Sequence, residues 1–587
     1  MKNYLLISLG HNSSAIFVDN SNDAQQIIGY EQERISGIKS DSQFPIDAVN
    51  EIIHNVGINK VYGSIICVSH WFNDIENFNS IPNKYITEND VDFLKHLSSD
   101  IRYVNKSFTH HDAHAYSAYA FFKYHLKERQ VSGKVHCLVV DGFGTNEEVL
   151  SLYECEKASG YLLLKHRTYD LHASLGLLYQ YATSFVEMKE NQDEYKFLGY
   201  ESHIDEVCNN VHIEAISLRA NRYSRELISR IEKNTKCSKN MPDSIIDYAD
   251  LDSVRADIYK ELESLIDYQD INTSTDRGTF KARCVVAYFV QSVCENVLKA
   301  VIEKHKIHNL IVTGGTFYNV KLNNVLLNSI DGLFCAMPLA GDQGAAIGMY
   351  EFIKSHNEKP FNFGKLLWGK RRFYNMQKLI EQKANDKIQY IQPAGTEEDA
   401  DRIAMLIAKR IIDGDIVNIV GRNMEFGPRA LCCTSTIFIP TSDNVHCNNH
   451  MNGRNEVMPC APICTKENAI KLFGQVELDR VIGSDAYMIC THTYNKPYSS
   501  HYGGIMHKKP LMEEYTGRPQ IVDENSIIGR VLKYVERATD YKALVNTSFN
   551  VHGRPIAFDT IAILENYEYQ CEHAFTFKVP YLFIIDC

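Results

Sequence analysis

The chain has 587 residues, of which 44% are hydrophobic and 23% are charged. This balance is typical of a globular protein and excludes a disordered chain, a collagen-like repeat and a coiled-coil rod. At about 150 residues per domain, the length predicts two or three domains. The formal net charge of −12 argues against a protein that wraps duplex DNA through a global positive field.

Cysteine usage and hydropathy indicate where the protein works. The 16 cysteines are scattered without the spacing of a disulfide scaffold, so we expect reduced thiols and a cytoplasmic protein. No uninterrupted apolar run approaches the roughly 20 residues that a membrane helix needs. The first apolar run is interrupted by His11 and Asn12 and lacks a small-residue cleavage site, so it predicts strand–turn–strand rather than a signal peptide.

Two hairpins are expected far apart in the chain. In the first 20 residues, apolar YLLISL and AIFV flank a polar turn at 10–14, and in 136–153 a similar pair flanks Asp141-Gly142-Phe143-Gly144. Glycine permits a tight turn and leaves N–H groups free to face an anion. Taken alone, each turn is better explained as a surface β-turn. Together they predict a duplicated, phosphate-clasping α/β fold.

The remainder of the first domain, 1–360, carries helices and one further strand. Residues 204–270 are charged and helix-periodic, which predicts a helical insertion, and 280–305 predict a buried amphipathic helix. A buried strand at 310–312 then leads into Thr313-Gly314-Gly315.

The pattern loosens afterwards, and a second α/β unit follows. We expect a linker at 361–395 and a second domain at 396–587. That domain should contain a helix at about 397–413, a strand at 416–420, and strands within YKALVNTSFN and VPYLFIID.

The sharpest local signal is THHDAHAYSAYAFF, residues 109–122, which predicts a helix. His110 and His114 lie at i and i+4, so both imidazoles leave one helix face and suit one metal ion. Asp342, between two glycines at a helix start, is the best third ligand, although such a residue is often a helix N-cap. His111 would point elsewhere, towards substrate. Two histidines and a carboxylate favour Fe²⁺, Zn²⁺ or Mn²⁺ over Ca²⁺; the alternative is a solvated histidine cluster.

Three other polar segments are weaker candidates. Glu31-Gln32-Glu33-Arg34 with Lys39 is most simply a solvated loop. Residues 423–431, NMEFGPRAL, place an arginine beside a rigid Gly-Pro turn, and arginine is the usual planar clamp for carboxylate or phosphate. Residues 546–550, NTSFN, form a polar cluster directly after a buried strand.

Two further patterns admit two interpretations each. A structural zinc site could draw on the cluster Cys432, Cys433, His446, Cys447, His450, Cys460 and Cys464, but the spacing fits no standard finger and favours buried thiols. Residues 368–374, WGKRRFY, mix cations and aromatics in a way that can hold single-stranded nucleic acid. A linker with a basic face explains that stretch as well, and we prefer it.

Together these motifs resemble the O-carbamoyltransferases of the nodulation-protein and tobramycin-biosynthesis type. The most specific segments are HHDAHAYSAY, DEYKFLGY at 193–200, TGGTFYNVKLN at 313–323, AGDQGAAIG, MEFGPRAL and NTSFN. The resemblance spans nearly the whole chain, from Gly10 to Asn550. It implies a duplicated actin/sugar-kinase-like N-terminal domain with a helical insertion, similar to the metal-binding subunit that makes threonylcarbamoyladenosine in tRNA, and a C-terminal YrdC-like α/β domain.

The resemblance also implies residue roles. His110, His114 and Asp342 would bind the metal, favoured as Fe²⁺; His11 would be a candidate base at the transfer site, His111 would face substrate, and Lys39 would bind the activated donor. Gly314, Gly315 and Asn319 would hold the adenosine, and Asp141 and Gly142 would flank its phosphate. In the second domain, ATP with its Mg²⁺ and carbamoyl phosphate would be bound by Arg422, Arg429, Arg454, Arg530, Ser548 and Asn550.

The implied chemistry has two steps. The second domain forms carbamoyl-adenylate from carbamoyl phosphate and ATP, and the first transfers the carbamoyl group to an alcohol on a sugar, a natural product or a hydroxymethylated nucleobase or DNA.

The chain departs from the family pattern mainly at cations of the second domain, with Cys432-Cys433-Thr434, Asn452 and Met458 in altered positions. A sugar-kinase-like phosphotransferase and a non-catalytic nucleotide-binding protein are the alternatives. The oligomeric state is left open.

Overall fold

The fold is taken from a computed structural model. It describes residues 2–71, 84–105, 107–127, 129–156, 160–236, 248–355, 357–383, 385–454, 457, 460–495 and 502–586. Met458, one of the departures from the family pattern, lies outside these residues, as do 237–247 of the expected helical insertion.

The N-terminal part contains two sheets built on the same plan. The first sheet begins with three consecutive antiparallel strands, β1 (Tyr4–Ser8), β2 (Ser14–Asp19) and β3 (Gln26–Glu31). Strand β4 (Ile65–Ser69) then pairs parallel to β1, and β5 (Ile101–Tyr103) follows at the edge. All residues of β1, β2 and β4 are buried, as expected for strands that are covered on both faces. The predicted first hairpin is confirmed, with Ser8 opposite Ser14.

The second sheet repeats this order. It begins with the antiparallel strands β6 (Val135–Val140), β7 (Glu148–Cys155) and β8 (Leu162–Tyr169). Strand β10 (Asn309–Thr313) then pairs parallel to β6, and β11 (Phe334–Ala336) follows. The only addition is the short edge strand β9 (Thr235–Lys236), which pairs with β8. The strand orders β3-β2-β1-β4-β5 and β8-β7-β6-β10-β11 correspond one to one, which confirms the predicted duplication.

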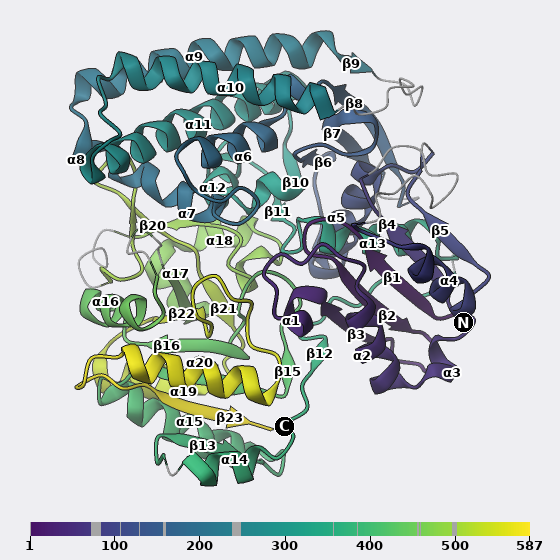
Figure 1. Ribbon diagram of the computed structural model, residues 1–587, viewed down its shortest axis with the longest axis vertical. Helices are drawn as coiled ribbons and strands as arrows, with labels where there is room; N and C mark the ends of the chain where they lie inside the picture. Colours follow the sequence, from purple (N-terminus) through teal and green to yellow (C-terminus); the bar gives the residue numbers. More distant parts are fainter. Residues whose placement is uncertain are drawn as a thin grey trace.

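Helices cover these sheets. Helices α5 (His110–Leu126) and α13 (Ala345–Ile353) pack on each other beside both sheets. The insertion contributes α9 (Asn210–Lys233) and α10 (Tyr248–Tyr268), and α9 packs on α11 (Asp276–His305). Figure 1 shows these three helices running together across one end of the molecule. By length and composition α11 could cross a membrane, but 67% of its apolar window is buried inside the protein, so the core accounts for that apolar stretch.

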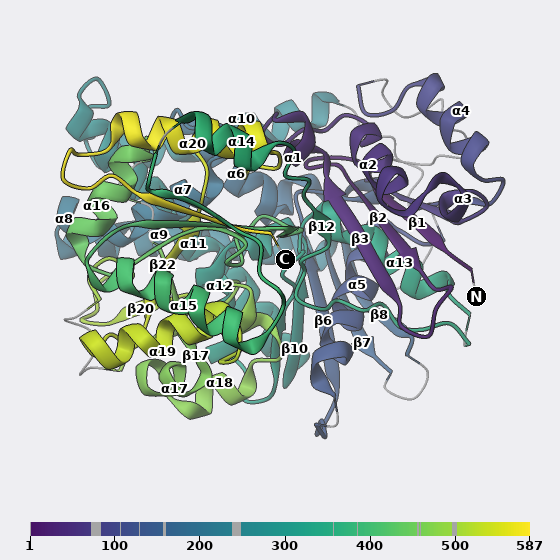
Figure 2. The same cartoon turned by 90° about the horizontal axis from the view of Figure 1, so that it is seen from below.

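The C-terminal part is a second α/β unit around a seven-stranded sheet of order β13-β23-β14-β16-β22-β17-β21. Strands β17 (Ala461–Thr465) and β21 (Gln520–Val522) lie at one end of that order, and β13 (Ile388–Ile391) lies at the other. Its central strands are β14 (Val417–Gly421), β16 (Thr434–Phe438), β22 (Leu544–Ser548) and β23 (Tyr581–Ile585). Helices α15 (Glu397–Ile412) and α19 (Ile527–Thr539) pack together against it. Figures 1 and 2 show this unit beside the two N-terminal sheets and below the helical layer. The strand expected at 416–420 is present as β14, and those expected within YKALVNTSFN and VPYLFIID are present as β22 and β23.

The stretch expected as a linker is structured at both ends. At its start, Phe361, Phe363 and Trp368 are buried in the N-terminal core, and residues 369–370 form β12, which pairs with β15 (Asn423–Met424). At its end, β13 (Ile388–Ile391) pairs with β23 of the C-terminal sheet. The chain therefore crosses between the two parts through residues that pack on each of them in turn.

The basic segment 368–374 turns its arginines inward. Arg371 is 1% exposed and donates to the backbone oxygens of Gly421, Asn423 and Ala557. Arg372 donates to Glu51 Oε1 at 2.6 Å. These two arginines therefore bind groups of the protein itself, whereas Lys370 of the same segment is exposed.

The charged segment after the first hairpin is also buried, so its interpretation as a solvated loop was wrong. Glu31 and Arg34 are 2% and 4% exposed and form an ion pair of 3.0 Å. Arg34 Nη2 donates to Gly427 O at 2.7 Å, and Gly427 N–H donates to Glu31 Oε2 at 3.1 Å. Each residue of the Glu31–Arg34 pair thereby forms a hydrogen bond with the backbone of the Gly-Pro turn in the second domain. Buried charges are tolerated here because each has a partner.

No disulfide joins any of the cysteines that the structure describes. Within the described part of the chain, only one group of side chains brings at least three metal-ligating atoms together, and it contains no cysteine. The zinc alternative built on the seven cysteines and histidines of 432–464 is therefore not supported.

Candidate functional site

The predicted two-histidine helix is present and is fixed by its own N-terminus. Thr109 caps α5 by accepting from Asp112 N–H at 3.2 Å, and Asp112 Oδ2 accepts from Thr109 N–H at 3.0 Å. This reciprocal capping box satisfies two otherwise unpaired amides. It starts the helix at His110, so that residue and His114 project from the first turns on one face.

Four side chains from three chain segments converge at this point. His110 Nε2 and His114 Nε2 are 3.1 Å apart. Asp342 Oδ1 lies 3.3 Å from His110 Nε2, and Asp141 Oδ2 lies 3.3 Å from His114 Nε2. All four ligand atoms lie within 4.8 Å of one another. The structure thus brings the three predicted ligands together and adds Asp141 as a fourth.

The charges of this His–Asp cluster are strongly coupled. Burial alone would lower the pKa of His110, but the hydrogen bonds and charges of Asp141 and Asp342 outweigh it and raise that pKa to about 10. Burial would raise the pKa of Asp342, but the two histidines lower it to about 2. The pKa of Asp141 is likewise held well below its usual value by both histidines, against burial. The cluster therefore favours a positive charge at its centre.

A divalent metal ion fits this cluster. Two neutral imidazoles and two carboxylates supply borderline and hard ligands, the mixture that Fe²⁺, Zn²⁺ and Mn²⁺ accept. Asp141 Oδ2 is buried, and its nearest printed neighbours are the Nε2 atoms of His114 at 3.3 Å and His110 at 3.6 Å, so a cation between these atoms would satisfy it. The carboxylate of Asp141 is also held in place: its Oδ1 accepts from Gly142 N–H at 2.8 Å and from Gly315 N–H at 3.3 Å.

Asp141 follows β6, and the sequence interpretation assigned it to a nucleotide phosphate. Strand β10, parallel to β6, ends in Thr313 and leads to Gly314 and Gly315. Because parallel strands end at the same sheet edge, the turn after β6 meets the glycine turn after β10. The sequence could have predicted this fourth ligand from one feature: Asp141 and the glycine pair each directly follow a buried strand.

His111 points away from the cavity, on the other side of α5. It is fully buried and does not line the cavity described below. Its backbone N–H donates to Glu148 Oε1 at 2.8 Å, and its Nδ1 lies 2.9 Å from Ser151 Oγ. Burial, followed by the charge of Arg167, lowers the pKa of His111 well below its usual value. This geometry places a neutral imidazole behind the metal ligands rather than against a substrate.

Behind α5 lies a buried polar network centred on Arg167. Its guanidinium pairs with Asp112 Oδ1 at 2.8 Å and Glu148 Oε2 at 3.2 Å, and Nε donates to Ser151 Oγ at 3.0 Å. Asp112 is the residue that closes the capping box of α5. The network therefore fixes the helix start that carries His110 and His114.

His11 reaches the site from the first hairpin turn. Its neighbour Gly10 has φ +132°, and a Cβ atom there would lie 2.5 Å from Asp342 Oδ2. Only glycine allows the backbone to approach this carboxylate so closely. His11 is exposed to solvent and lines the cavity. Lys39 also lines it, with Nζ at 3.3 Å from both carboxylate oxygens of Glu33.

The residues expected around the adenosine lie next to the cluster. Gly314, at φ +98°, sits against Val140 O, which a Cβ atom would meet at 2.2 Å. Gly142, Gly315 and Asn319 line the cavity. Asn319 caps α12 (Val320–Asn328) through its Oδ1 and donates from Nδ2 to Gln291 at 2.7 Å.

At the other end of the cavity stand three arginines of the C-terminal part. Arg454 donates to Ser548 Oγ at 3.0 Å and to Asn550 Oδ1 at 3.0 Å. Arg429 and Arg518 form no ion pair with any carboxylate that the structure describes. Burial, followed by the charge of Arg429, lowers the pKa of Arg518 to about 9. This arginine cluster, Arg429, Arg454 and Arg518, is therefore a positive site whose guanidinium groups are in no ion pair with a described carboxylate.

Of the second-domain residues expected at the donor site, four are brought together and two are not. Arg429, Arg454, Ser548 and Asn550 line the cavity. Arg422 is 51% exposed and pairs with Asp586 at 3.3 Å, and Arg530 pairs with Glu397 and Asp401; neither lines the cavity. Arg518 was missed, because a lone arginine after β20 (Tyr515–Gly517) has no sequence signal.

One cavity of about 700 Å³ joins the two ends. Its lining runs from His11, Asp141 and Asp342 in the N-terminal part to Arg429, Arg454 and Arg518 in the C-terminal part. Segment 193–200 contributes Asp193, Tyr195 and Lys196 to its wall. Its volume lies within the range of small-molecule sites, and its two ends belong to different parts of the chain.

Comparison with known families decides what kind of protein carries this cavity. A model described as the carbamoyltransferase N-terminus matches residues 4–350, and one described as the carbamoyltransferase C-terminus matches 408–573. The chain belongs to the carbamoyltransferase family. As a carbamoyltransferase it is an enzyme, and both ends of its cavity fall within the two matched regions.

Similar proteins include relatives from archaea and bacteria. An uncharacterised protein of Methanocaldococcus jannaschii is 25% identical to this carbamoyltransferase over 93% of each chain. Nodulation protein U of Sinorhizobium fredii is 26% identical over 280 residues, which are 46% of this chain and 44% of that protein. A solved structure of a Sua5 variant from P. abyssi aligns with a TM-score of 0.23 at 14% identity, covering 34% of this chain and 52%, about half, of that one.

Proposed function

We propose that this carbamoyltransferase makes a carbamate ester in two steps within one cavity. The observation that carries the proposal is the continuous lining between the arginine cluster and the His–Asp cluster. A phosphate-rich donor needs cations, and an acyl-type transfer to an alcohol needs a base and a means of polarising a carbonyl. The two ends of the cavity supply these two sets of groups separately.

The first step is activation of the carbamoyl group at the arginine cluster. Carbamoyl phosphate and water give carbamate and phosphate, and the carbamate oxygen then attacks the α-phosphorus of ATP·Mg²⁺. This attack forms carbamoyl-adenylate and releases pyrophosphate. Arg429, Arg454 and Arg518 would bind the phosphates in this step, because guanidinium groups match phosphate oxygens in shape and charge. Ser548 and Asn550 hold the guanidinium of Arg454 and would share donor binding.

The second step takes place at the His–Asp cluster. The alcohol oxygen attacks the carbamoyl carbon, AMP leaves with the bonding electron pair, and the hydroxyl proton passes to His11 as the base. Gly314, Gly315 and Asn319 would hold the adenosine of the adenylate, Gly142 would lie beside its phosphate, and Lys39 would bind the donor. His111 would keep α5 in position from behind.

The metal site serves this second step. His110, His114, Asp141 and Asp342 would hold a divalent ion, with Fe²⁺ favoured and Zn²⁺ and Mn²⁺ as the other candidates. When bound, such an ion polarises a carbonyl and offsets negative charge that develops on it.

The test is product analysis with the purified holoenzyme, carbamoyl phosphate, labelled ATP and a panel of alcohols. We expect phosphate, pyrophosphate and AMP in equal amounts, together with a carbamate ester of one alcohol. ADP as the sole nucleotide product would overturn the proposal in favour of a sugar-kinase-like phosphotransfer. Nucleotide binding without any product would instead favour the other alternative, a non-catalytic nucleotide-binding protein.

A further inference from the structure

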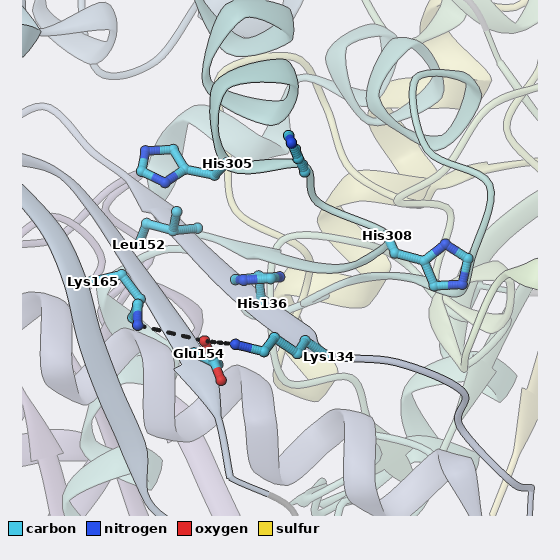
Figure 3. A pocket seen from close by; sticks show the side chains of 8 residues that line it. Lys134, His136, Leu152, Glu154, Lys165, His305 and His308 are labelled. Atoms are coloured by element: carbon cyan, nitrogen blue, oxygen red, sulfur yellow. Dashed lines mark hydrogen bonds and ion pairs between the residues drawn. The ribbon is translucent and has the colours of Figure 1, made fainter.

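A second cavity lies at the other end of the same sheet. It has a volume of about 420 Å³ and is lined by Lys134, His136, Leu152, Glu154, Lys165, His305, Lys306 and His308 (Figure 3). Lys134 and His136 stand at the start of β6, whereas Asp141 follows its end. With about 3.3 Å per residue in a strand, the two sites lie roughly 20 Å apart along β6. The cavity is therefore separate from the carbamoyl-transfer site.

Basic groups dominate this second cavity. Three lysines line it, and two of them share one carboxylate: Glu154 Oε2 lies 2.9 Å from Lys134 Nζ and 3.6 Å from Lys165 Nζ. In Figure 3 the two lysines reach Glu154 from opposite sides. Lys306 is exposed and forms no ion pair with a described residue. After Glu154 has balanced one lysine, about two positive charges remain.

His136 supplies a hydrogen-bonding group at the floor of the cavity. It is 7% exposed, and its Nδ1 has no partner among the described residues. Figure 3 shows the ring between Glu154 and the end of α11, where His305 stands. Burial lowers the pKa of His136, with Lys134 and Lys165 acting in the same direction and Glu154 opposing. The region around the His136 ring is therefore positively charged, and an anion bound there would supply the missing negative charge.

The opposing features are weaker than the attraction. The C-terminal end of α11 presents a partial negative charge of about half a unit, and Glu154 is already shared between two lysines. Asp331, the other carboxylate beside a lining residue, is already paired with His308. A metal ion is an unsuitable occupant: among the described residues, only the His–Asp cluster places ligating atoms close enough to hold one. Lysines and imidazole N–H groups are donors, which suit an oxyanion.

We propose that this cavity is a second anion site that binds a phosphate group, carried either as free phosphate or as the phosphomonoester of a small molecule. Its volume exceeds the need of a bare ion and falls within the range of small-molecule pockets. The three lysines would surround the phosphate, and His136 would donate from the floor. The proposal does not depend on the proposed carbamoyl transfer, because it concerns binding at the opposite end of β6.

The test is equilibrium dialysis of the full chain against radiolabelled inorganic phosphate at low ionic strength. We compare the wild type with Lys306→Glu, His136→Gln and, to identify phosphate bound at the catalytic cavity, Arg518→Gln. We expect one class of bound phosphate to weaken at least tenfold in Lys306→Glu and in His136→Gln and to persist in Arg518→Gln. Lys306 is exposed, so its variant keeps the test valid if His136→Gln fails to fold.

The matched control is Lys378→Glu, because Lys378 is also exposed and forms no ion pair with a described residue. If this control weakens phosphate binding as much as Lys306→Glu, general charge attraction explains the data and the proposal fails. It fails equally if both cavity variants bind phosphate like the wild type. Competition by glycerol 3-phosphate assigns the source: tighter binding than phosphate identifies a phosphomonoester, and equal or weaker binding identifies the free ion.

Discussion

The two ends of the catalytic cavity solve the problem of charge in opposite ways. In the His–Asp cluster, two imidazoles and two carboxylates face each other within 4.8 Å, and a capping box and a buried arginine network hold them in place. In the arginine cluster, Arg429 and Arg518 repel each other without a described carboxylate beside them. The first end is preformed for a cation, and the second presents guanidinium groups that are free to pair with an anion.

The comparison teaches which end a substitution should disable. Removing a ligand of the His–Asp cluster should affect metal content and transfer but leave donor activation intact. Removing a guanidinium should affect donor binding but leave the metal in place. The expected effects below run from the largest to the smallest.

His110→Ala should remove the divalent metal and lower carbamate-ester formation by at least about 100-fold, because a site loses a direct ligand rather than an outer-shell partner. Metal content measured by mass spectrometry and ester formation measured by chromatography check this. The matched control is His212→Ala, since His212 is exposed on α9, and its metal content and activity should equal those of the wild type. Full metal content in His110→Ala would remove this residue from the ligand set.

Asp141→Asn sharpens the assignment of the fourth ligand. If Asp141 is a metal ligand, removal of its charge should lower the affinity for the metal by about 10- to 100-fold. The KM for ATP should then stay unchanged. If Asp141 instead serves mainly beside a nucleotide phosphate, KM would change and metal affinity would not. Titration with the apo-protein and ATP kinetics separate the two roles.

Arg518→Gln should raise KM for the donor substrates by about 10- to 100-fold. This is the loss of affinity expected when one charge-assisted hydrogen bond to a phosphate is removed. Metal content should stay at the wild-type level, which distinguishes this variant from those of the His–Asp cluster. Arg518→Lys keeps the charge but loses the planar fork and should recover only part of the affinity. Unchanged kinetics in Arg518→Gln would exclude this arginine from donor binding.

Gly10→Ala tests the close approach of the first turn to Asp342. A Cβ atom would meet Asp342 Oδ2 at 2.5 Å, and φ +132° is unfavourable for alanine. We expect metal affinity to fall about tenfold while the far-ultraviolet circular dichroism stays native. Gly553→Ala is the control for glycine loss alone, because a Cβ atom there meets nothing within 4 Å although φ is also positive.

Arg422→Gln and Arg530→Gln should have the smallest effects. Arg422 is half exposed, both arginines are paired with acids outside the cavity, and exposed ion pairs contribute less than about 1 kcal/mol. Both variants should keep KM for ATP within about twofold of wild type. A large rise in KM would mean that these arginines move into the cavity when ligand binds.

Local patterns in the sequence were sufficient for much of this site. The i, i+4 histidines and the Thr109–Asp112 capping box lie within one helix turn, so their geometry follows from helix periodicity. The two hairpins likewise follow from apolar runs flanking short polar turns, and their repetition predicted the duplicated sheets.

What the sequence did not reveal depends on contacts between distant segments. Arg518, Arg422 and Arg530 have equally plain surroundings in the chain, and only the tertiary fold places the first in the cavity and the other two outside it. The same holds for Glu31 and Arg34, which are buried because the turn at Gly427 in the other domain covers them. A charged segment predicts exposure until its partner is known.

The most direct test of two separable ends in one cavity is ATP–pyrophosphate exchange in His110→Ala, driven by carbamoyl phosphate. The variant should exchange labelled pyrophosphate into ATP at close to the wild-type rate while forming no carbamate ester. Loss of exchange together with ester formation, in a variant that is folded, would contradict the separation of the arginine cluster from the His–Asp cluster.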